Sequence, residues 1–375
     1  MKPICMVDLQ TQYASIKEEI DTAIQEVVSS AQYIKGPQVK QFEEAVAKYM
    51  GVKYAISCAN GTDALIIALK SLDLPAGSEV IVPSFTFAAT AEAAIYCGLI
   101  PVFADIDPGL FTIDINHAEK LVTSKTKAII PVHLFGQCAD MTRILRLANK
   151  HKLYVIEDAA QAMGAAHHFP CGTPHKGGTL GNIGCTSFFP SKNLGCFGDG
   201  GCIFTNDDIF AQKCRLIANH GMAVKYEHEI PGVNSRLDTI QAAILNVKLK
   251  YLDNYISARQ KAASHYNEEL KKVKGIKLPE KVKTSTHTYN QYSIIVEKGN
   301  RDELKKYLED KGIPTMIYYP KALHQQKAFV QYVIDTKHLK NTEMICGKIL
   351  SLPMHTELDE EQIKYIADCI IQFFK

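Results

Sequence analysis

The chain has 375 residues, of which 46% are hydrophobic, so it is long enough to bury a large core and to divide into two domains. Its 42 basic and 40 acidic residues give a formal net charge of +2. This near balance shows none of the basic excess typical of proteins that bind nucleic acid or an anionic membrane surface, so we expect neither partner.

The eleven cysteines stand singly, with no Cys-x-x-Cys pair, so the sequence indicates neither a zinc site nor a disulfide framework, and we expect no bound metal. Their odd number and free spacing are typical of a reducing cytoplasm. The first residues lack an apolar signal core, and no run of about 18 apolar residues occurs anywhere. We therefore expect a cytoplasmic protein.

The N-terminal segment has apolar residues at every third or fourth position between Ile16 and Val27, which predicts an amphipathic helix. Gly36 and Pro37 interrupt the pattern before a second predicted helix over about 39–49. Because both helices precede the main sheet, we expect them to serve a dimer.

From Tyr54 onward, short apolar runs alternate with helical stretches. In chain order the runs are YAISCA, EVIVP, PVFADID, AIIPVHLFG, YVIEDA, CTSFF and GGCIFTN. Strands that alternate with helices predict an α/β fold, in which a mostly parallel sheet is flanked by helices on both faces.

A long helix is predicted from near Leu237 to beyond Tyr266, and the sequence changes character around it. We place the domain boundary there, so that residues 1–250 form a large domain and 251–375 a small C-terminal domain. The run NQYSIIV, a helix from about Arg301 and a final amphipathic helix after Leu358 predict an α+β architecture for the small domain.

Two residues between 155 and 192 suggest the chemistry. Asp158 follows an apolar run, at the point where residues leave a parallel sheet and face a ligand. Lys192 follows a second apolar run and Pro190, and a desolvated lysine of this kind is suited to forming a Schiff base. Such a lysine, together with a carboxylate that meets a pyridinium nitrogen, is the protein half of pyridoxal phosphate chemistry. Taken alone, an aspartate after a strand is more often a helix cap or a turn residue, and a lysine beside a proline is more often a solvated surface charge.

Five motifs in order make the chain resemble the sugar aminotransferases of the DegT/DnrJ/EryC1/StrS family, which have the type I (aspartate aminotransferase) fold. They are NGTDAL (60–65), PSFTFAAT (83–90), EDAAQ (157–161), SFFPSK followed by GDGG (187–201) and GVNSRLD (232–238). The resemblance implies a transaminase that uses pyridoxal 5'-phosphate. It also implies that the GGCIFTN strand joins the main sheet in an antiparallel direction.

The resemblance assigns the cofactor phosphate to Gly61, Thr62 and Ser187. The residues themselves support a phosphate cradle only weakly, since Asn-Gly is also a plain turn and Thr62 also a helix cap. Asn234 is assigned to the phosphate of the neighbouring subunit, so the resemblance implies a homodimer with shared active sites.

The remaining assignments concern the pyridine ring and the reacting amine. The resemblance places Phe85 against the ring, although core packing is the ordinary reading of that residue. It places Asp158 at the ring nitrogen, Gln161 at the phenolic oxygen, and Lys192 as the Schiff-base lysine and proton carrier. Family dehydratases have histidine at this lysine position, so Lys192 favours transamination.

Several residues are expected near the substrate or outside the site. Arg236 is suited to an anion but equally to a salt bridge with Asp238. The likeness to the family makes Tyr318, Tyr319 and His324 candidate substrate contacts. Glu157 would face away from Asp158 in a strand. His133 and His220 are interpreted as structural histidines.

The expected reaction transfers an amino group from L-glutamate, which leaves as 2-oxoglutarate, to a nucleotide-linked ketosugar for cell-surface polysaccharide synthesis. Within the family, the chain most resembles enzymes that aminate C3 of UDP-2-acetamido-2-deoxy-3-keto sugars or their uronic acids. Asn219 occupies a position where the uronic acid enzymes have arginine, which leaves the carboxylated sugar open. The alternatives are a dTDP-keto-deoxysugar aminated at C3 or C4, and a non-catalytic regulator that senses the cofactor or a sugar nucleotide.

Overall fold

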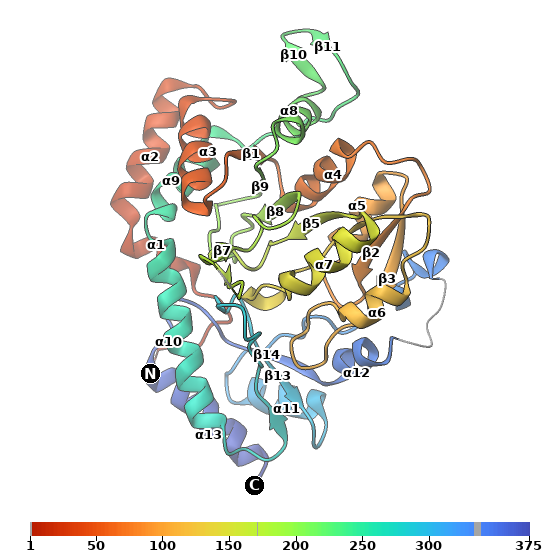
Figure 1. Cartoon of the computed structure of the whole chain (residues 1–375). Helices are drawn as coiled ribbons and strands as arrows, with labels where there is room; N and C mark the ends of the chain where they lie inside the picture. Colours follow the sequence, from red (N-terminus) through yellow and green to blue (C-terminus); the bar gives the residue numbers. More distant parts are fainter. Residues whose placement is uncertain (1, 171, 334–338) are drawn as a thin grey trace.

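The computed structural model describes residues 2–170, 172–333 and 339–375, and its centre is a seven-stranded sheet (Figure 1). The strand order is β1-β9-β8-β5-β4-β2-β3. The strands are β1 (Tyr54–Cys58), β2 (Glu79–Pro83), β3 (Ile100–Ala104), β4 (Thr126–Ile129), β5 (Tyr154–Asp158), β8 (Ile183–Ser187) and β9 (Gly201–Thr205). The predicted alternation of strands and helices is thereby confirmed.

Strand β9 alone within this sheet runs against its neighbours, since it pairs antiparallel with both β1 and β8. The pairs β5–β8, β4–β5, β2–β4 and β2–β3 are parallel. The expected mixed, mostly parallel sheet is therefore correct. The six strands other than β9 all have their carboxyl ends at the same edge of the sheet, and ligands bind at this edge in α/β proteins.

Helices cover both faces of the sheet (Figure 1). One face packs against α4 (Gly61–Ser71), α5 (Ala89–Tyr96) and α8 (Asp208–Ile217). The opposite face packs against α6 (Ile115–Lys120) and α7 (Met141–His151) near β2 to β5, and against α3 (Pro37–Met50) near β1 and β9. Val80 and Val82 point to the first face and Ile81 to the second, so both sides of β2 are apolar, as buried parallel strands require.

The single long helix predicted from Leu237 is wrong, because the structure has α9 (Thr239–Leu249) and α10 (Leu252–Leu270). The amides of Lys250 and Tyr251 donate to carbonyls three residues earlier, which tightens the backbone and ends the first helix. The Tyr251 hydroxyl then bonds to Glu19, which lies on α2 (Lys17–Ser30). A contact with a segment more than 200 residues away thus accompanies the break.

A second sheet lies beyond α10, where β12 (Ile276–Lys277), β13 (Tyr292–Val296) and β14 (Ile349–Leu352) pair antiparallel. It packs with α10, α11 (Arg301–Asp310) and α13 (Glu360–Phe373) around a core of its own, and α12 (Lys340–Lys348) precedes β14. The N-terminal residues also reach this region, where the Met354 amide donates to the Met6 carbonyl (Figure 1). The boundary at residue 250 stays a prediction.

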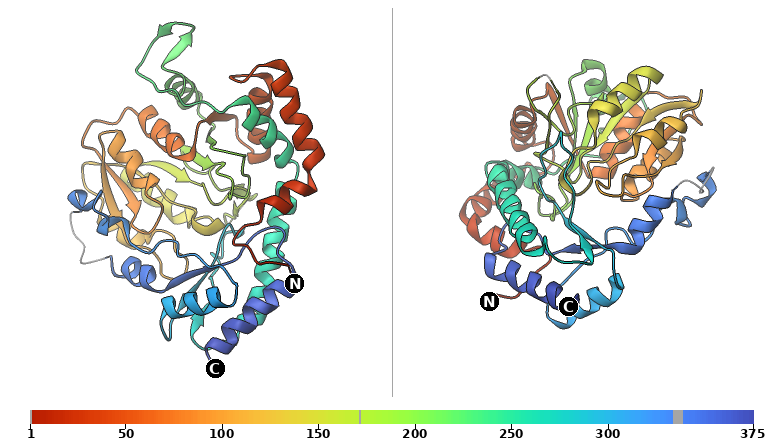
Figure 2. Two further views of the ribbon diagram at one scale, coloured as in Figure 1. Left: turned by 180° about the vertical axis from the view of Figure 1, so that it is seen from behind. Right: turned by 60° about the horizontal axis from the view of Figure 1, so that its bottom comes forward.

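The predicted N-terminal helix consists of α1 (Leu9–Ser15) and α2, and α2 packs on α9 through Ile20, Ile244 and Val247. Two short hairpins complete the fold. One joins β6 (Ala166–His167) to β7 (His175–Lys176), and the other, β10 (Met222–Val224) with β11 (Glu227–His228), projects from the body (Figure 2). Within the ranges described above, no helix is long and apolar enough to cross a membrane.

Candidate active site

Asp158 is the last residue of β5, and its carboxylate is held by two donors. The Thr90 hydroxyl donates to Oδ2 at 2.9 Å, and the Ala160 amide donates to Oδ1 at 3.2 Å. Burial raises the pKa of this carboxyl, and the bonds from Thr90 and Ala160 act in the opposite direction. Each carboxylate oxygen can accept a further bond, so the group is fixed but not saturated.

Lys192 lies in a turn after β8, where its amide donates to the Phe189 carbonyl at 2.8 Å. The side chain is half-buried, and desolvation lowers its pKa to about 8, an effect that the charge of Asp158 opposes. Lys192 and Asp158, which are 34 positions apart in the sequence, therefore interact electrostatically. A lysine with this pKa has a substantial neutral fraction near pH 8, which nucleophilic attack requires.

Gly61 and Ser187 meet where β1 leads into α4. Asn60 caps α4 by accepting from the Asp63 amide, so the amides of Gly61 and Thr62 point out of the helix end without a partner inside the helix. A Cβ added to Gly61 would lie only 2.7 Å from the Ser187 Cβ. The backbone amides at the start of α4 and the Ser187 side chain thus lie close together, an arrangement suited to an anion such as a phosphate.

The two phenylalanines of the 83–90 motif differ sharply in exposure. Phe85 is 1% exposed and is surrounded by the rings of Phe111, Phe135 and Tyr319. Phe87 is 60% exposed, and its ring contacts that of Tyr319 at 6.3 Å between centroids. A cofactor ring needs a free aromatic face, so we now assign the stacking position to Phe87 and regard Phe85 as core.

Gln161 links the sheet to the 316–320 segment. Its Oε1 accepts from the Phe135 amide at 2.7 Å, and its Nε2 donates to the Tyr319 hydroxyl at 3.2 Å. One amide hydrogen remains for another acceptor, as its predicted bond to the cofactor requires. Tyr319 therefore borders the same site as Gln161 and Phe87, while Tyr318 is half-buried beside it.

His324 is 2% exposed, and both of its ring nitrogens have partners within the chain. Nδ1 lies 2.7 Å from the Ser84 hydroxyl, and Nε2 lies 3.0 Å from Glu343 Oε1. The first bond fastens the 322–326 segment to the end of β2, and the second fastens it to α12. We therefore expect His324 to position this segment, and its contact with a substrate stays a prediction that nothing in its surroundings favours.

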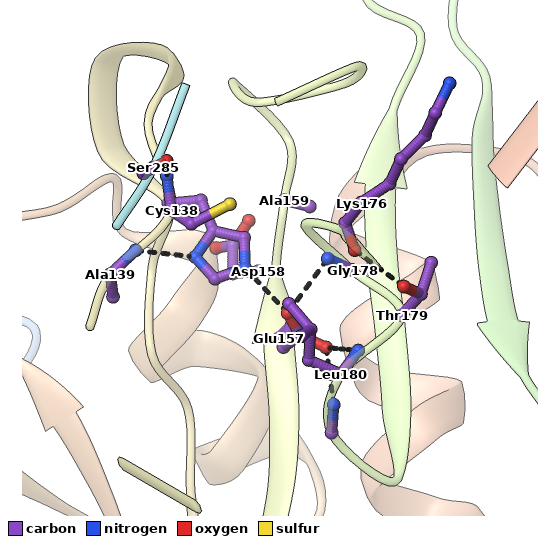
Figure 3. A network of polar contacts seen from close by, with 12 residues as sticks. Cys138, Ala139, Glu157, Asp158, Ala159, Lys176, Gly178, Thr179, Leu180 and Ser285 are labelled. Atoms are coloured by element: carbon purple, nitrogen blue, oxygen red, sulfur yellow. Dashed lines mark hydrogen bonds and ion pairs between the residues drawn. The ribbon is translucent and has the colours of Figure 1, made fainter. Parts of the chain in front are cut away.

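Glu157 is fully buried on the side of β5 opposite to Asp158, as the alternation of a strand predicts (Figure 3). Its Oε1 accepts from the amides of Leu180 and Gly181, each at 2.6 Å. Its Oε2 accepts from the Gly178 amide at 2.9 Å and from His133 Nε2 at 2.8 Å. Four donors saturate this carboxylate, so its burial is compensated.

His133 connects this network to the functional side of the sheet. Its Nδ1 accepts from the Ala139 amide at 3.2 Å, which assigns the proton to Nε2, and its own amide donates to the Asp158 carbonyl at 2.9 Å. His133 is thus a structural residue, as the sequence indicates. Sequence analysis missed the role of Glu157, because its four donors lie 20 or more residues away along the chain.

Asn234 and Arg236 lie apart from Asp158, around two cavities near α3 and α9. Both residues line the first cavity, which also includes Asn60. The second, of about 340 Å³, is lined by Arg236, Lys35 and Asn219, among others. Arg236 has no carboxylate within ion-pair distance among the residues whose positions are described, so a salt bridge with Asp238 does not form. Within one chain, the contact of Asn234 with a cofactor phosphate is not tested.

Comparisons with known proteins agree with this geometry. A model of the DegT/DnrJ/EryC1/StrS aminotransferase family matches residues 14–371. The pleiotropic regulatory protein of Geobacillus stearothermophilus is 46% identical over 99% of this chain and 98% of its own length. The UDP-2-acetamido-2-deoxy-3-oxo-D-glucuronate aminotransferase of Pseudomonas aeruginosa is 46% identical over 96% of this chain and 98% of its own.

Solved structures show the same fold. An aminotransferase of this family from Brucella abortus has a TM-score of 0.94 and 42% identity, and covers 99% of each chain. Bacillus subtilis NtdA with bound cofactor PMP, the amino form of pyridoxal phosphate, has a TM-score of 0.87 and 33% identity over 98% of this chain and 83% of its own. The type I fold expected from the sequence is therefore correct.

Proposed function

Because the chain belongs to the DegT/DnrJ/EryC1/StrS aminotransferase family and is a pyridoxal phosphate-dependent nucleotide-sugar aminotransferase, we propose that it aminates C3 of a UDP-2-acetamido-2-deoxy-3-oxo sugar or its uronic acid. The proposed amino donor is L-glutamate. The 46% identity to an enzyme named for a substrate of this class supports the proposal. A cytoplasmic location and a role in cell-surface polysaccharide synthesis belong to the same proposal.

The residues of the site fit pyridoxal phosphate. The amides at the start of α4 and the Ser187 hydroxyl would hold the phosphate, and the Ser187 Cβ lies so close to Gly61 that no side chain would fit there. Asp158 would hold the proton on the ring nitrogen, Gln161 would donate to the phenolic oxygen, and Phe87 would cover the ring. When bound, the cofactor supplies an electron sink for moving the amino group.

Lys192 would bind the cofactor and carry the proton between the substrate carbon and the cofactor. Its pKa of about 8 suits both tasks, because a general acid and base works best when its pKa lies near the working pH. The observation that carries the proposal is this lysine in electrostatic contact with the buried Asp158, at the carboxyl edge of the sheet.

The cavity of about 340 Å³ suits an anionic substrate. Lys35 and Arg236 both line it, and neither has a carboxylate within ion-pair distance among the described residues, although the charge of Glu43, which also lines the cavity, acts on Lys35. Arg215 also lines it but is engaged by Glu43 at 2.8 Å. Burial and the charge of Arg236 lower the pKa of Lys35, as expected where two cations share one space that a bound anion would neutralise. Arg236 and Lys35 could serve a sugar carboxylate despite asparagine at position 219.

We also infer a homodimer with shared sites. Large apolar side chains are exposed close to the cofactor site and around the cavities, namely Tyr33, Ile34, Phe189 and Phe197, with 46%, 49%, 52% and 43% exposure. A second copy would cover such a patch. It would also bring its own Asn234 and Arg236 toward Lys192. Sedimentation at nanomolar concentration, together with kinetics, tests this, and a fully active monomer would refute it.

Two other functions remain to be separated from this one. A dTDP-linked ketosugar would require only a different pocket, and the name of the Geobacillus relative favours a regulatory role in addition. The test is an assay of L-glutamate with a panel of UDP- and dTDP-ketosugars, with products identified by mass spectrometry and NMR. Amination of the dTDP sugars alone would contradict the proposal, and binding of the cofactor or a sugar nucleotide without turnover would favour a regulator.

A further inference from the structure

We propose that Thr90 is a positioning residue for the reaction, whose buried hydroxyl holds the Asp158 carboxylate ionised and oriented toward the cofactor's ring nitrogen. The inference rests on the proposed function of Asp158 and deepens it. Thr90 is the last residue of the 83–90 motif, and neither the motif nor its burial by itself assigns it a role in the reaction.

The hydroxyl of Thr90 is placed so that it must donate to the carboxylate. Thr90 is completely buried, and its Oγ1 lies 2.9 Å from Asp158 Oδ2. Among the described residues, the Thr86 hydroxyl also lies within hydrogen-bond distance of the Thr90 Oγ1, at 3.4 Å. A carboxylate can only accept, so the Thr90 hydrogen points at Asp158, and Thr86 can donate to the Thr90 oxygen in turn.

This bond opposes the effect of burial on Asp158. Desolvation favours the neutral carboxyl and raises its pKa, whereas the Thr90 bond favours the ionised form and lowers it. A neutral carboxyl would offer no charge to a protonated pyridine nitrogen. The other direct donor, the Ala160 amide, lies at 3.2 Å and belongs to the backbone, so Thr90 supplies the side-chain hydrogen bond to this group among the described residues, alongside the weaker effect of the Lys192 charge.

The bond also fixes where the carboxylate points. Thr90 is near the start of α5, and its amide lies 3.4 Å from the Phe87 carbonyl. Phe87 is the aromatic side chain that we assign to the ring face. The segment from Phe87 to Thr90 would therefore act on the cofactor in two ways. Phe87 would contact the ring directly, and Thr90 would act on the ring nitrogen indirectly, through Asp158.

A cofactor analogue isolates this effect from structural damage. We would titrate the apoprotein with pyridoxal phosphate and with 1-deaza-pyridoxal phosphate, in which CH replaces the ring nitrogen, and measure both dissociation constants. The phosphate and the aldehyde are the same in the two ligands, so their affinity ratio reports the interaction at the ring nitrogen. The variants are Thr90→Val, which removes the hydroxyl at nearly constant volume, and Thr90→Ser, which restores it.

We expect the wild-type protein to prefer pyridoxal phosphate, and Thr90→Val to reduce this preference about tenfold, since a bond to a charged group is lost. Affinity for the analogue should change little, and Thr90→Ser should recover most of the preference. Thr205→Val is the matched control, because Thr205 is also buried and donates to one oxygen, the Asn182 carbonyl at 2.9 Å, at the far end of β9. Thr90→Ala serves the same test if the valine variant does not fold.

An unchanged preference in a folded Thr90→Val or Thr90→Ala protein would overturn the role of Thr90 while leaving that of Asp158 intact. An equal loss of affinity for both ligands would also overturn it, because the residue would then act only through packing. A wild-type protein with no preference for pyridoxal phosphate would overturn the role of Asp158 itself, and the proposal for Thr90 with it.

Discussion

Glu157 and Asp158 are adjacent acidic residues at the end of one strand, and both are buried, yet their surroundings differ. Glu157 accepts from three amides and one imidazole, so no acceptor position is left for a ligand. Among the described residues, the Asp158 carboxylate accepts from one hydroxyl and one amide, and the charge of Lys192 acts on it. A saturated buried carboxylate stabilises the fold, whereas one held by fewer donors can still meet a cofactor. Substitutions on the Asp158 side of β5 should therefore affect activity, and those on the Glu157 side should affect stability.

The largest effect is expected from Lys192→Ala, which removes the reacting amine and the proton carrier on the Asp158 side. Turnover with glutamate and a ketosugar should be abolished, while the unfolding midpoint stays close to that of the wild type. The matched control is Lys176→Ala, since desolvation also lowers the pKa of Lys176 to about 8, but this lysine packs on the Tyr49 ring. Substantial activity in the Lys192 variant would disprove the assignment of the reacting lysine.

Asp158→Asn should slow the half-reaction with glutamate by orders of magnitude with little change in stability. The volume is kept, but the charge that holds the pyridine nitrogen protonated is lost. Each unit by which the pKa of the ring nitrogen changes corresponds to about 1.4 kcal/mol, and we expect a change of several units. Stopped-flow absorbance with glutamate alone measures this step, because no sugar is needed. A rate within threefold of wild type would mean that Asp158 acts only as a strand-end cap.

Glu157→Gln should show the opposite behaviour, with a loss of about 3 kcal/mol in the free energy of unfolding. The new NH2 group would replace an oxygen that accepts two hydrogen bonds, so two of the four buried donors would lose their acceptor. Chemical denaturation of the holoenzyme measures the loss. Glu119→Gln is the control, because that carboxylate pairs with Lys150 on the surface, where ion pairs contribute little to stability. Equal stabilities for the two variants would contradict the structural role of Glu157.

The smallest effect is expected at Phe87, which extends the comparison from carboxylates to aromatic rings. Phe87→Ala should weaken binding of pyridoxal phosphate about fivefold to tenfold, since a stacked ring contributes roughly 1 kcal/mol. Stability should be almost unchanged, because the side chain is largely exposed. Phe85→Leu should instead lower stability while retaining the cofactor affinity. If Phe85→Leu loses the cofactor and Phe87→Ala keeps it, the assignment of the ring face is reversed.

The sequence by itself determined the α/β class, the order of the strands along the chain and the location of Asp158, Lys192 and Gly61. These features depend on local patterns, namely apolar runs that alternate with helical periodicity, and polar residues placed where parallel strands end. The alternation of a strand also placed Glu157 on the far side from Asp158, as the structure confirms.

Only the tertiary structure decided what surrounds each of these groups. Which phenylalanine of PSFTFAAT is core depends on Phe111, Phe135 and Tyr319, and the break between α9 and α10 involves Glu19. Burial and hydrogen bonding are set by segments that are distant in the sequence, so no local pattern records them. For the same reason, the bond from Thr90 to Asp158, which joins residues 68 positions apart, appears only in the folded chain.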